Sequence, residues 1–296
     1  MSRRQLTVII CTRDRPRIVL NTLDALARQR ERNFAVLVID QSASADAEVA
    51  RRIAGEGWTL LADAGHGLAR ARNIGWKQAD TDWVVYVDDD VLPQPGWAAG
   101  VTAAIAGHPE ASALMGHTPA VNAQDGDYLT ISEFPIEEEQ VLGGRWLRPW
   151  LIGFGLNQGF RRSVLRDLGG FDERLGAGAA DFPSADDMDM NYRFLRAGGL
   201  AVLAPAAAAA HDQWRTSADL APQYGRYMRG WTGFAMKHLR KGDVLGGMWL
   251  WQIGLRDVIR MFASALRRRS RLRLRVALHK ARGLAEGTWV GLRYPW

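Results

Sequence analysis

The sequence predicts an α/β protein built on a doubly wound, mostly parallel sheet with helices on both faces. Four short apolar runs rich in β-branched residues alternate with segments whose apolar residues recur at helical spacing, which is the pattern of consecutive βαβ units. The chain has 296 residues, 47% of them hydrophobic, and is therefore long enough to bury a large core.

The four apolar runs are nearly continuous, as in strands that are buried on both faces of a parallel sheet. We expect these strands at residues 6–11, 34–40, 58–62 and 83–87. Right-handed crossovers then place a helix between each pair of consecutive strands. The apolar spacing predicts these helices at residues 18–27, 47–53 and 68–75.

The second half of the chain is less regular. Residues 118–150 are polar and are typical of a long excursion or lid. Helices are expected at residues 161–168 and 184–198, the second with Ser184 as its N-cap. An extended segment then leads to His211.

Composition argues against several classes of protein. The single cysteine, Cys11, cannot build a disulfide framework or a thiolate metal site, which favours a reducing compartment. The apolar stretch near the start is too short for a signal peptide. The longest uncharged stretches, residues 198–211 and 244–255, are too short or too broken to cross a bilayer. We expect neither a secreted nor an integral membrane protein.

Polar residues follow three of the predicted strands at the point where each strand ends. The first strand runs into residues 11–16, the second ends at Asp40, and the fourth runs into Asp88, Asp89 and Asp90. Ligands of open α/β sheets bind beyond the carboxyl ends of the strands, so this edge predicts a binding site. Taken singly, each of these residues also suits a turn or a helix N-cap.

The three adjacent aspartates give the strongest chemical signal. In an extended chain, Asp88 and Asp90 point to one side and Asp89 points to the other. Two close carboxylates repel each other unless a cation lies between them, and oxygen ligands suit Mg²⁺ or Mn²⁺. The pattern predicts a divalent metal site whose open positions accept phosphate oxygens of a nucleotide.

Six motifs occur in the order and at about the spacing seen in the inverting family 2 glycosyltransferases, whose fold is called GT-A. They are TVIICTRDRP, VLVIDQS, GLARARNIGW, VYVDDDVLP, GGFDERL and DDMDMNYRFLRAGG. The chain resembles this family over roughly residues 5–215, and the combination of motifs makes the resemblance specific. It implies a GT-A fold with a Rossmann-like sheet, a nucleoside-diphosphate sugar as the donor, and Mn²⁺ or Mg²⁺ as the cofactor.

The resemblance also implies roles for residues that contact the nucleotide. Thr12 and Arg13 would lie near the base and the ribose. Asp40 would accept hydrogen bonds from the base. Arg72, with Asn73 beside it, would reach the nucleotide from the following helix.

Metal ligands follow from the same resemblance. Asp88 and Asp90 match the family's D-x-D motif, with Asp89 as the alternative member. His211 lies where some members supply a histidine as a further ligand, and an imidazole beside carboxylates suits Mn²⁺. A solvent-facing or capping role for His211 is an equal alternative.

The segment ADDMDMNYR is similar to the family's helical EDxDxxxR pattern. On that match Asp187 is the general base, Asp189 supports it, and Arg193 orients the helix. Asp186 replaces the usual Glu and is one methylene shorter, so the choice of base between Asp186 and Asp187 stays open.

Residues 144–160 occupy the position where the family builds its acceptor site. We expect Trp146 and Trp150 to stack on the acceptor, and Asn157 of the same segment is assigned to the acceptor as well. Core packing is the alternative for the tryptophans.

The basic tail mixes apolar and cationic residues. Residues 222–296 hold 16 Lys and Arg against 3 Asp and Glu, whereas residues 1–221 hold 22 against 29. Residues 247–283 alternate Trp, Leu, Ile, Met and Phe with ten Lys and Arg, which is typical of an amphipathic helix on an anionic membrane surface. A lobe packed on the rest of the chain, a homo-oligomer contact and, with least weight, a nucleic-acid site are the alternatives.

These observations predict a GT-A catalytic domain at residues 1–221 and a helical, basic region at residues 222–296. The nucleotide-sugar half spans about residues 1–115 and the acceptor half about 116–221. We expect a metal-dependent, inverting hexosyl- or deoxyhexosyltransferase. A lipid-linked or cell-surface glycan is one candidate for its acceptor, and a polysaccharide, a small metabolite and a protein are the alternatives. Its expected location is the cytoplasm or the inner face of the membrane.

Two other classes of protein remain as alternatives. A nucleotidyltransferase on a related sheet would need a glycine-rich signature after the first strand, and CTRDRPRIV contains no glycine. A non-catalytic sugar-nucleotide or membrane-surface binder would be expected to lose some catalytic carboxylates, yet Asp88, Asp90 and Asp187 are all present.

Overall fold

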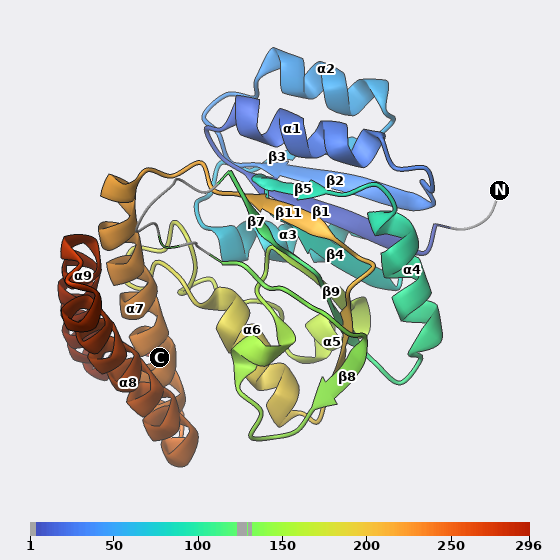
Figure 1. Cartoon of the computed structure of the whole chain (residues 1–296). Helices are drawn as coiled ribbons and strands as arrows, with labels where there is room; N and C mark the ends of the chain where they lie inside the picture. Colours follow the sequence, from blue (N-terminus) through green and yellow to red (C-terminus); the bar gives the residue numbers. More distant parts are fainter. Residues whose placement is uncertain (1–3, 123–128, 130–131) are drawn as a thin grey trace.

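The computed structural model of the chain describes residues 4–122, 129 and 132–296. Its main sheet has eight strands in the order β3-β2-β1-β4-β9-β6-β10-β8, and a smaller sheet has the order β5-β11-β7. Figure 1 shows helices on both faces of the main sheet and three long helices packed beside the α/β domain. The α/β fold class predicted from the sequence is confirmed.

The predicted first half of the sheet is present with small changes at the strand ends. Its strands are β1 (Leu6–Thr12), β2 (Phe34–Asp40), β3 (Thr59–Ala62) and β4 (Trp83–Val87). All of them run parallel, with Leu6 paired to Phe34 on one side and to Trp83 on the other. Their carboxyl ends therefore meet at one edge of the sheet, where the sequence places its polar residues.

The helices between these strands form where the apolar spacing predicts them. They are α1 (Pro16–Ala27), α2 (Ala47–Gly55) and α3 (Leu68–Gln78). Pro16 occupies the first turn of α1, where a missing N–H costs nothing, and Asp46 caps α2 by accepting from the N–H groups of Glu48 and Val49. Gly67 precedes α3 with a φ of 111°, a conformation that favours glycine.

Side chains of the central strands alternate between two cores. Val8 and Ile10 of β1 pack with Leu23 of α1 on one face. Ile9, between them in the chain, packs with Ala71 of α3 on the other face. This period of two is the reason that the strand sequences are apolar throughout.

The second half completes both sheets. Its elements are β5 (Val91–Pro93), α4 (Trp97–Gly107), β6 (Ala113–Gly116), β7 (Ala120–Val121), β8 (Gln140–Gly143), the 3₁₀ helix η1 (Pro149–Ile152), β9 (Asn157–Arg161), α5 (Arg162–Asp167), α6 (Asp186–Arg196), β10 (Leu200–Ala204) and β11 (Ala209–Asp212). Strand β9 runs antiparallel to both β4 and β6. The excursion predicted at 118–150 includes β7, β8 and part of η1, and its residues 123–128 and 130–131 lie outside the described residues.

Helix α6 begins differently from the prediction. Ser184 is not its N-cap: Ala185 holds that position with a φ of 72°, and no side chain caps the helix. The Ser184 hydroxyl instead donates to the carbonyl of Tyr227, 3.0 Å away on helix α7. Ser184 thus joins the start of α6 to the C-terminal helices.

The C-terminal region consists of α7 (Ser217–Arg240), α8 (Val244–Arg268) and α9 (Arg271–Arg293). Helix α9 lies close against α7 because glycines recur on it every four residues. A Cβ at Gly283 would lie 2.3 Å from the carbonyl oxygen of Gly225, and one at Gly287 would lie 2.6 Å from that of Arg229. The predicted basic segment therefore belongs to two helices of a packed lobe. Val258, one of its apolar residues, is buried in that lobe.

No helix within the described part of the chain is long and apolar enough to cross a membrane. The lobe joins the α/β domain through a shared apolar cluster that includes Tyr192 of α6, Phe234 of α7 and Leu250 of α8. This contact fixes the position of α7 relative to α6.

Candidate active site

A cavity of about 780 Å³ opens where β1 and β4 end and extends to the C-terminal helices. Residues after β1 and β4 border it, namely Thr12, Arg13, Arg15, Asp88, Asp89 and Asp90. The start of α6 and the segment before β9 contribute Gly155, Asp186 and Asp187. Helices α7, α8 and α9 supply the remaining wall, including Tyr224, Tyr227, Met228, Trp231, Ile253 and Lys280.

The three aspartates form a turn rather than the end of an extended strand. Strand β4 ends at Val87, and the N–H of Val91 donates to the carbonyl of Asp88 at 3.1 Å. The expected alternation of an extended chain is therefore wrong for this segment. The turn gives each carboxylate its own set of partners.

Asp88 and Asp89 are held by residues from different elements. Asp88 Oδ1 accepts from Arg72 Nη2 at 3.1 Å. Asp89 accepts from the hydroxyl of Thr12 at 2.8 Å and from Arg15 at 3.0 Å. Burial, reinforced by the neighbouring Asp90 charge, raises the pKa of Asp89 above its ordinary value. Asp89 thus stabilises the loop after β1.

Asp90 lies between His211 and Trp214. Its Oδ1 is 3.5 Å from His211 Nε2, and its Oδ2 accepts from Trp214 Nε1 at 2.9 Å. Burial raises the pKa of Asp90, but the hydrogen bond and charge of His211 and the donor of Trp214 outweigh burial and lower it. Asp90 is therefore anionic at neutral pH, as a metal ligand must be.

Trp214 was missed in the sequence. Its ring lies between two cations, with the Arg15 guanidinium 5.1 Å and the Arg215 guanidinium 4.4 Å from the ring centre. The feature of the sequence that could have indicated Trp214 is the run HDQWR, in which it lies three residues after His211. Trp214 fixes one oxygen of Asp90 and brings positive charge to the same edge of the cavity.

Arg72 connects the aspartate turn to α6. Its side chain is buried, and Nη1 donates to Asp186 at 2.6 Å while Nη2 donates to Asp88 and, at 3.0 Å, to the carbonyl of Gly155. Burial raises the pKa of Asp186 above its ordinary value. Asp186 thus serves as a buried ion-pair partner of Arg72.

Asp187 has a different environment from its neighbour. It is half-buried and borders the cavity, where its Oδ2 accepts from the N–H of Gly155 at 3.0 Å and its Oδ1 accepts from the N–H of Met188 at 2.8 Å. These two donors fix the direction of the carboxylate and leave its other lone pairs for a substrate. Of the two carboxylates, Asp187 therefore has the oxygen lone pairs available to a bound molecule.

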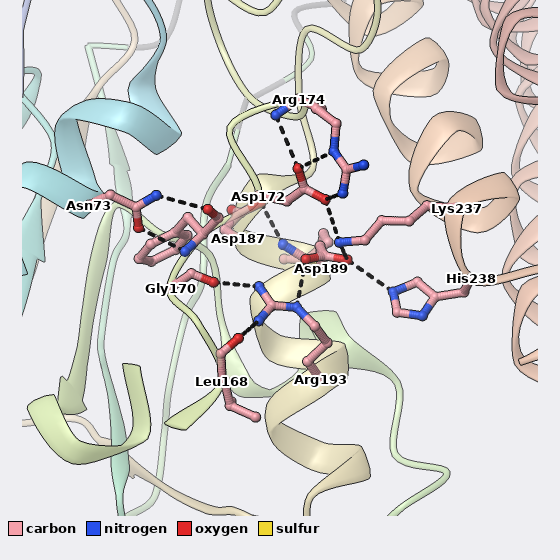
Figure 2. A network of polar contacts seen from close by, with 12 residues as sticks. Asn73, Leu168, Gly170, Asp172, Arg174, Asp187, Asp189, Arg193, Lys237 and His238 are labelled. Carbon is pink, nitrogen blue, oxygen red and sulfur yellow. Dashed lines mark hydrogen bonds and ion pairs between the residues drawn. The ribbon is translucent and has the colours of Figure 1, made fainter. Parts of the chain in front are cut away.

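A buried polar network lies behind Asp187 (Figure 2). Asp189, with no exposed surface, accepts from Arg193 at 2.8 Å, from Lys237 at 2.7 Å and lies 2.9 Å from His238 Nε2. Burial raises the pKa of Asp189, but these charges outweigh it and hold the pKa well below its usual range. The sequence indicated Asp189 and Arg193 but gave no sign of their α7 partners.

Arg193 and Lys237 connect this network to the loop before α6. Arg193 donates to the carbonyls of Leu168 and Gly170 at 2.7 Å each. Lys237 Nζ also lies 2.7 Å from Asp172 Oδ2. Figure 2 shows these contacts surrounding the first turns of α6 from both sides. The network therefore sets the position of the helix that carries Asp187.

Four predicted site residues do not border the cavity. Asn157 is fully buried and bonds to Trp97 Nε1 and the carbonyl of Ala207, so it cannot contact an acceptor directly. Trp146 is 55% exposed and packs on Trp249 and Arg196. These two assignments are corrected, because both side chains have structural partners away from the cavity.

The other two residues lie next to residues that do border the cavity. Asp40 is buried and accepts from the N–H of Ser42, whereas Gln41 beside it lines the cavity. Asn73 bonds to both the N–H and the carbonyl of Phe171, so it orders that loop instead of reaching the nucleotide. Of the predicted acceptor residues, Trp150 lines the cavity.

The described residues contain no group of three or more His, Cys, Asp or Glu side chains arranged to hold a metal ion. They do place one carboxylate and one imidazole together, since Asp90 and His211 are 3.5 Å apart and Asp88 borders the same cavity. These donors suit Mn²⁺ or Mg²⁺ when phosphate oxygens and water complete the coordination.

Residues 7–169 match the family described as Glycosyl transferase family 2. The chain belongs to this family. The pre-mycofactocin glycosyltransferase of Mycobacterium tuberculosis is 30% identical over 161 residues, which cover 49% of this chain and 30% of that protein. The validoxylamine A glucosyltransferase of Streptomyces hygroscopicus subsp. jinggangensis is 28% identical over 221 residues, or 64% of this chain and 50% of that protein. The chain thus spans half or less of the length of these curated relatives.

Solved structures of glycosyltransferases share the fold of this family 2 member. A mannosyltransferase from Pyrobaculum calidifontis, in complex with GDP-Man and Mn²⁺, has a TM-score of 0.62 at 18% identity, covering 99% of this chain and 88% of its own. S. aureus TarS 1–349 in complex with UDP-GlcNAc has a TM-score of 0.61 at 19% identity, covering 79% and 66%. The GT-A fold expected from the motifs is confirmed. Because the family match ends at residue 169, the roles of α6 to α9 rest on their geometry.

Proposed function

We propose that this family 2 glycosyltransferase transfers a hexosyl or deoxyhexosyl group from a nucleoside-diphosphate sugar to an acceptor hydroxyl, with inversion. One observation carries the proposal: Asp187 and the turn Asp88 to Asp90 border the same cavity, with Arg72 between them. A single in-line displacement needs a base and a diphosphate site on opposite sides of the anomeric carbon.

The donor binds at the carboxyl ends of β1 and β4. Thr12 and Arg13 border the cavity there and are placed to contact the base and ribose, together with Gln41 after β2. Arg15 borders the same edge and is directed at Asp89. Its positive charge favours a bound diphosphate.

Asp187 acts as the general base. It removes the proton from the acceptor hydroxyl as that oxygen attacks the anomeric carbon, and no covalent enzyme intermediate is needed. The N–H groups of Gly155 and Met188 hold the carboxylate in place before the substrate arrives. Asp189 and Arg193 support this role by positioning α6.

A divalent cation, when bound, would supply positive charge that neutralises the departing diphosphate. Asp90, Asp88 and His211 would hold it. The Nδ1 atom of His211 lies 3.2 Å from the carbonyl oxygen of Ser132 and 3.2 Å from the side-chain amide nitrogen of Gln213, and these contacts orient the ring so that Nε2 faces Asp90. Trp214 fixes the second oxygen of Asp90 and thus orients the carboxylate toward His211.

The outer face of α8 and α9 suits an anionic membrane surface. Leu266 is 76% exposed at the end of α8, and Leu278 is 55% exposed on α9. Exposed arginines accompany them, namely Arg256, Arg267, Arg268, Arg269, Arg271, Arg275 and Arg282. Apolar side chains that enter the lipid, surrounded by cations that contact phosphate headgroups, are the pattern of a peripheral membrane contact.

The first test is calorimetric binding of UDP, GDP, dTDP and their sugars with Mn²⁺, with Mg²⁺ and with a chelator. We expect one nucleotide to bind in a metal-dependent manner and Asp90→Asn to remove most of that dependence. Asp167→Asn, an exposed residue of α5, is the matched control. Absence of binding for every nucleotide, with or without metal, would overturn the proposal.

A further inference from the structure

The cavity extends well beyond the catalytic carboxylates. Past Asp187 it is bordered by Met228 and Trp231 of α7, by Ile253 and Gly254 of α8, and by Lys280 of α9. All three helices lie outside the residues that match the family. Whatever occupies this part of the cavity is therefore recognised by a wall that belongs to the C-terminal lobe.

The wall beside Asp187 is apolar. The rings of Trp150 and Trp231 lie 5.7 Å apart at a tilt of 60°, and Phe154, Met188 and Met228 border the same space. The only polar atom of the Trp231 side chain, Nε1, donates to the carbonyl of Leu250 at 2.9 Å. Trp231 thus presents carbon atoms to the cavity and no hydrogen-bond donor.

Gly254 lets α8 approach this wall closely. A Cβ at this position would lie 3.0 Å from Trp231 Cδ1 and 3.3 Å from Met228 Sδ. Both distances are tighter than ordinary van der Waals contact, so a side chain here would displace Trp231 and Met228. The glycine therefore preserves the position of both residues at the edge of the cavity.

The far end of this wall is polar. Lys280 Nζ donates to Asp257 at 2.8 Å and lies 4.7 Å from the centre of the Tyr224 ring, and Arg260 borders the cavity beside them. A bare oligosaccharide needs many hydrogen-bond partners along its length, which the patch formed by Trp150, Met188, Met228 and Trp231 does not offer. An apolar body with a hydroxyl at one end and a polar group at the other matches the order of these environments.

We propose that the C-terminal lobe is the acceptor-binding module and that the acceptor carries an aromatic or alkyl body next to its reacting hydroxyl group or sugar. This inference rests on the proposed function, because it assumes that Asp187 activates the hydroxyl. It assigns the Trp150, Met228, Trp231 and Ile253 side chains to the acceptor body.

The test compares two probes that differ only in their apolar part, 4-nitrophenyl β-D-glucoside and methyl β-D-glucoside. Binding of each is measured calorimetrically on the full chain in the presence of the nucleoside diphosphate that binds best. We expect the nitrophenyl compound to bind about tenfold more tightly, because burying one aromatic ring contributes at least that factor. Equal affinity for the two probes would overturn the inference.

Variants assign the effect to the wall. Gly254→Leu places a side chain against Trp231 and Met228 and so displaces them, and Ile253→Asn makes the wall polar with the same number of side-chain heavy atoms; each should weaken nitrophenyl binding about fivefold or more. Ile259→Asn is the matched control, since Ile259 lies on the same helix but is 57% exposed on its outer face. An equal loss in the control, or no loss in either wall variant, would overturn the assignment.

The outcomes separate this inference from the proposed function. Nucleoside diphosphate affinity is measured on every variant and should stay within about twofold, because the donor edge of the cavity is unchanged. If the nucleotide binds and sugar transfer proceeds only to acceptors without an apolar body, the inference alone fails. If no nucleotide binds and the nitrophenyl probe still does, the proposed function fails.

Discussion

Lys237 on α7 donates to Asp189 on α6 at 2.7 Å, and both side chains are buried. The same ammonium group lies 2.7 Å from half-buried Asp172, so one cation contacts two carboxylates. Asp189 is two residues from Asp187, and the ion pair therefore links the position of Asp187, the proposed base, to the C-terminal lobe.

Lys237→Met should lower the free energy of unfolding by about 3 kcal/mol, because it removes one of the cations that contact buried Asp189 and half-buried Asp172 while roughly keeping the side-chain volume. Urea denaturation measures the change. Lys241→Met, an exposed lysine just after α7, is the control and should change stability by less than about 0.5 kcal/mol. A similar, small effect of both substitutions would mean that Asp189 is neutralised without Lys237.

Asp172 makes part of this stability depend on pH. Burial raises its pKa, but hydrogen bonds and charge from Arg174 and Lys237 outweigh burial and lower the pKa from 3.8 to about 2. A pKa that is lower in the folded state stabilises the protein above the unfolded value and loses this effect as the pH falls through the folded value. The contribution near neutral pH is on the order of 2 kcal/mol.

Asp172→Asn tests this dependence. The stability difference between wild type and variant should be constant above about pH 5 and should shrink as the pH falls toward 2. Urea denaturation series at several pH values give the difference directly. A gap that stays the same down to the acid limit would show that the carboxylate charge of Asp172 does not stabilise the fold.

Asp187→Asn should reduce kcat by about 10³-fold or more and leave nucleoside diphosphate affinity within about twofold, because only the proton acceptor is lost. Asp186→Asn should behave differently. It removes the charge partner of buried Arg72, so it should lower the melting temperature and weaken nucleotide binding through Asp88. Near-normal turnover of Asp187→Asn would place the base elsewhere.

The sequence predicts the first half of the sheet well because the information there is local. Continuous apolar runs specify β1 to β4, helical spacing specifies α1 to α3, and strand ends specify where Thr12 and Asp88 to Asp90 meet. The sequence predicts where the three aspartates lie but not that they form a turn. The conformation of this turn depends on Leu156, whose carbonyl accepts from Asp88 N–H across the sheet edge.

Assignments that depend on partners far along the chain were missed or wrong. Asn157 was assigned to the acceptor because it lies in the segment 144–160. Its partners, Trp97 and Ala207, are 60 and 50 residues away. Lys237 and His238 likewise lie 48 and 49 residues from Asp189. Sequence periodicity cannot reveal such pairings, because they form only when the helices and strands pack together.

The basic face of the lobe, formed by α8 and α9, is expected to bind an anionic membrane surface. Deleting the lobe is a poor test, since Trp231 and Leu250 belong to a cluster shared with α6, and removing it would expose apolar surface on the catalytic domain. Point substitutions avoid this difficulty. The variant changes four exposed arginines at the turn between α8 and α9 to Gln, namely Arg267, Arg268, Arg269 and Arg271.

Binding of this variant to vesicles that contain phosphatidylserine should weaken by about 100-fold or more, because each cation near an anionic surface contributes about 1 kcal/mol. The control removes the same number of charges from exposed positions of the α/β domain, at Arg4, Arg30, Arg51 and Arg166, and should bind almost as wild type. Sedimentation with vesicles measures both. Equal weakening in the two variants would mean that net charge, rather than the face formed by α8 and α9, brings the protein to the membrane.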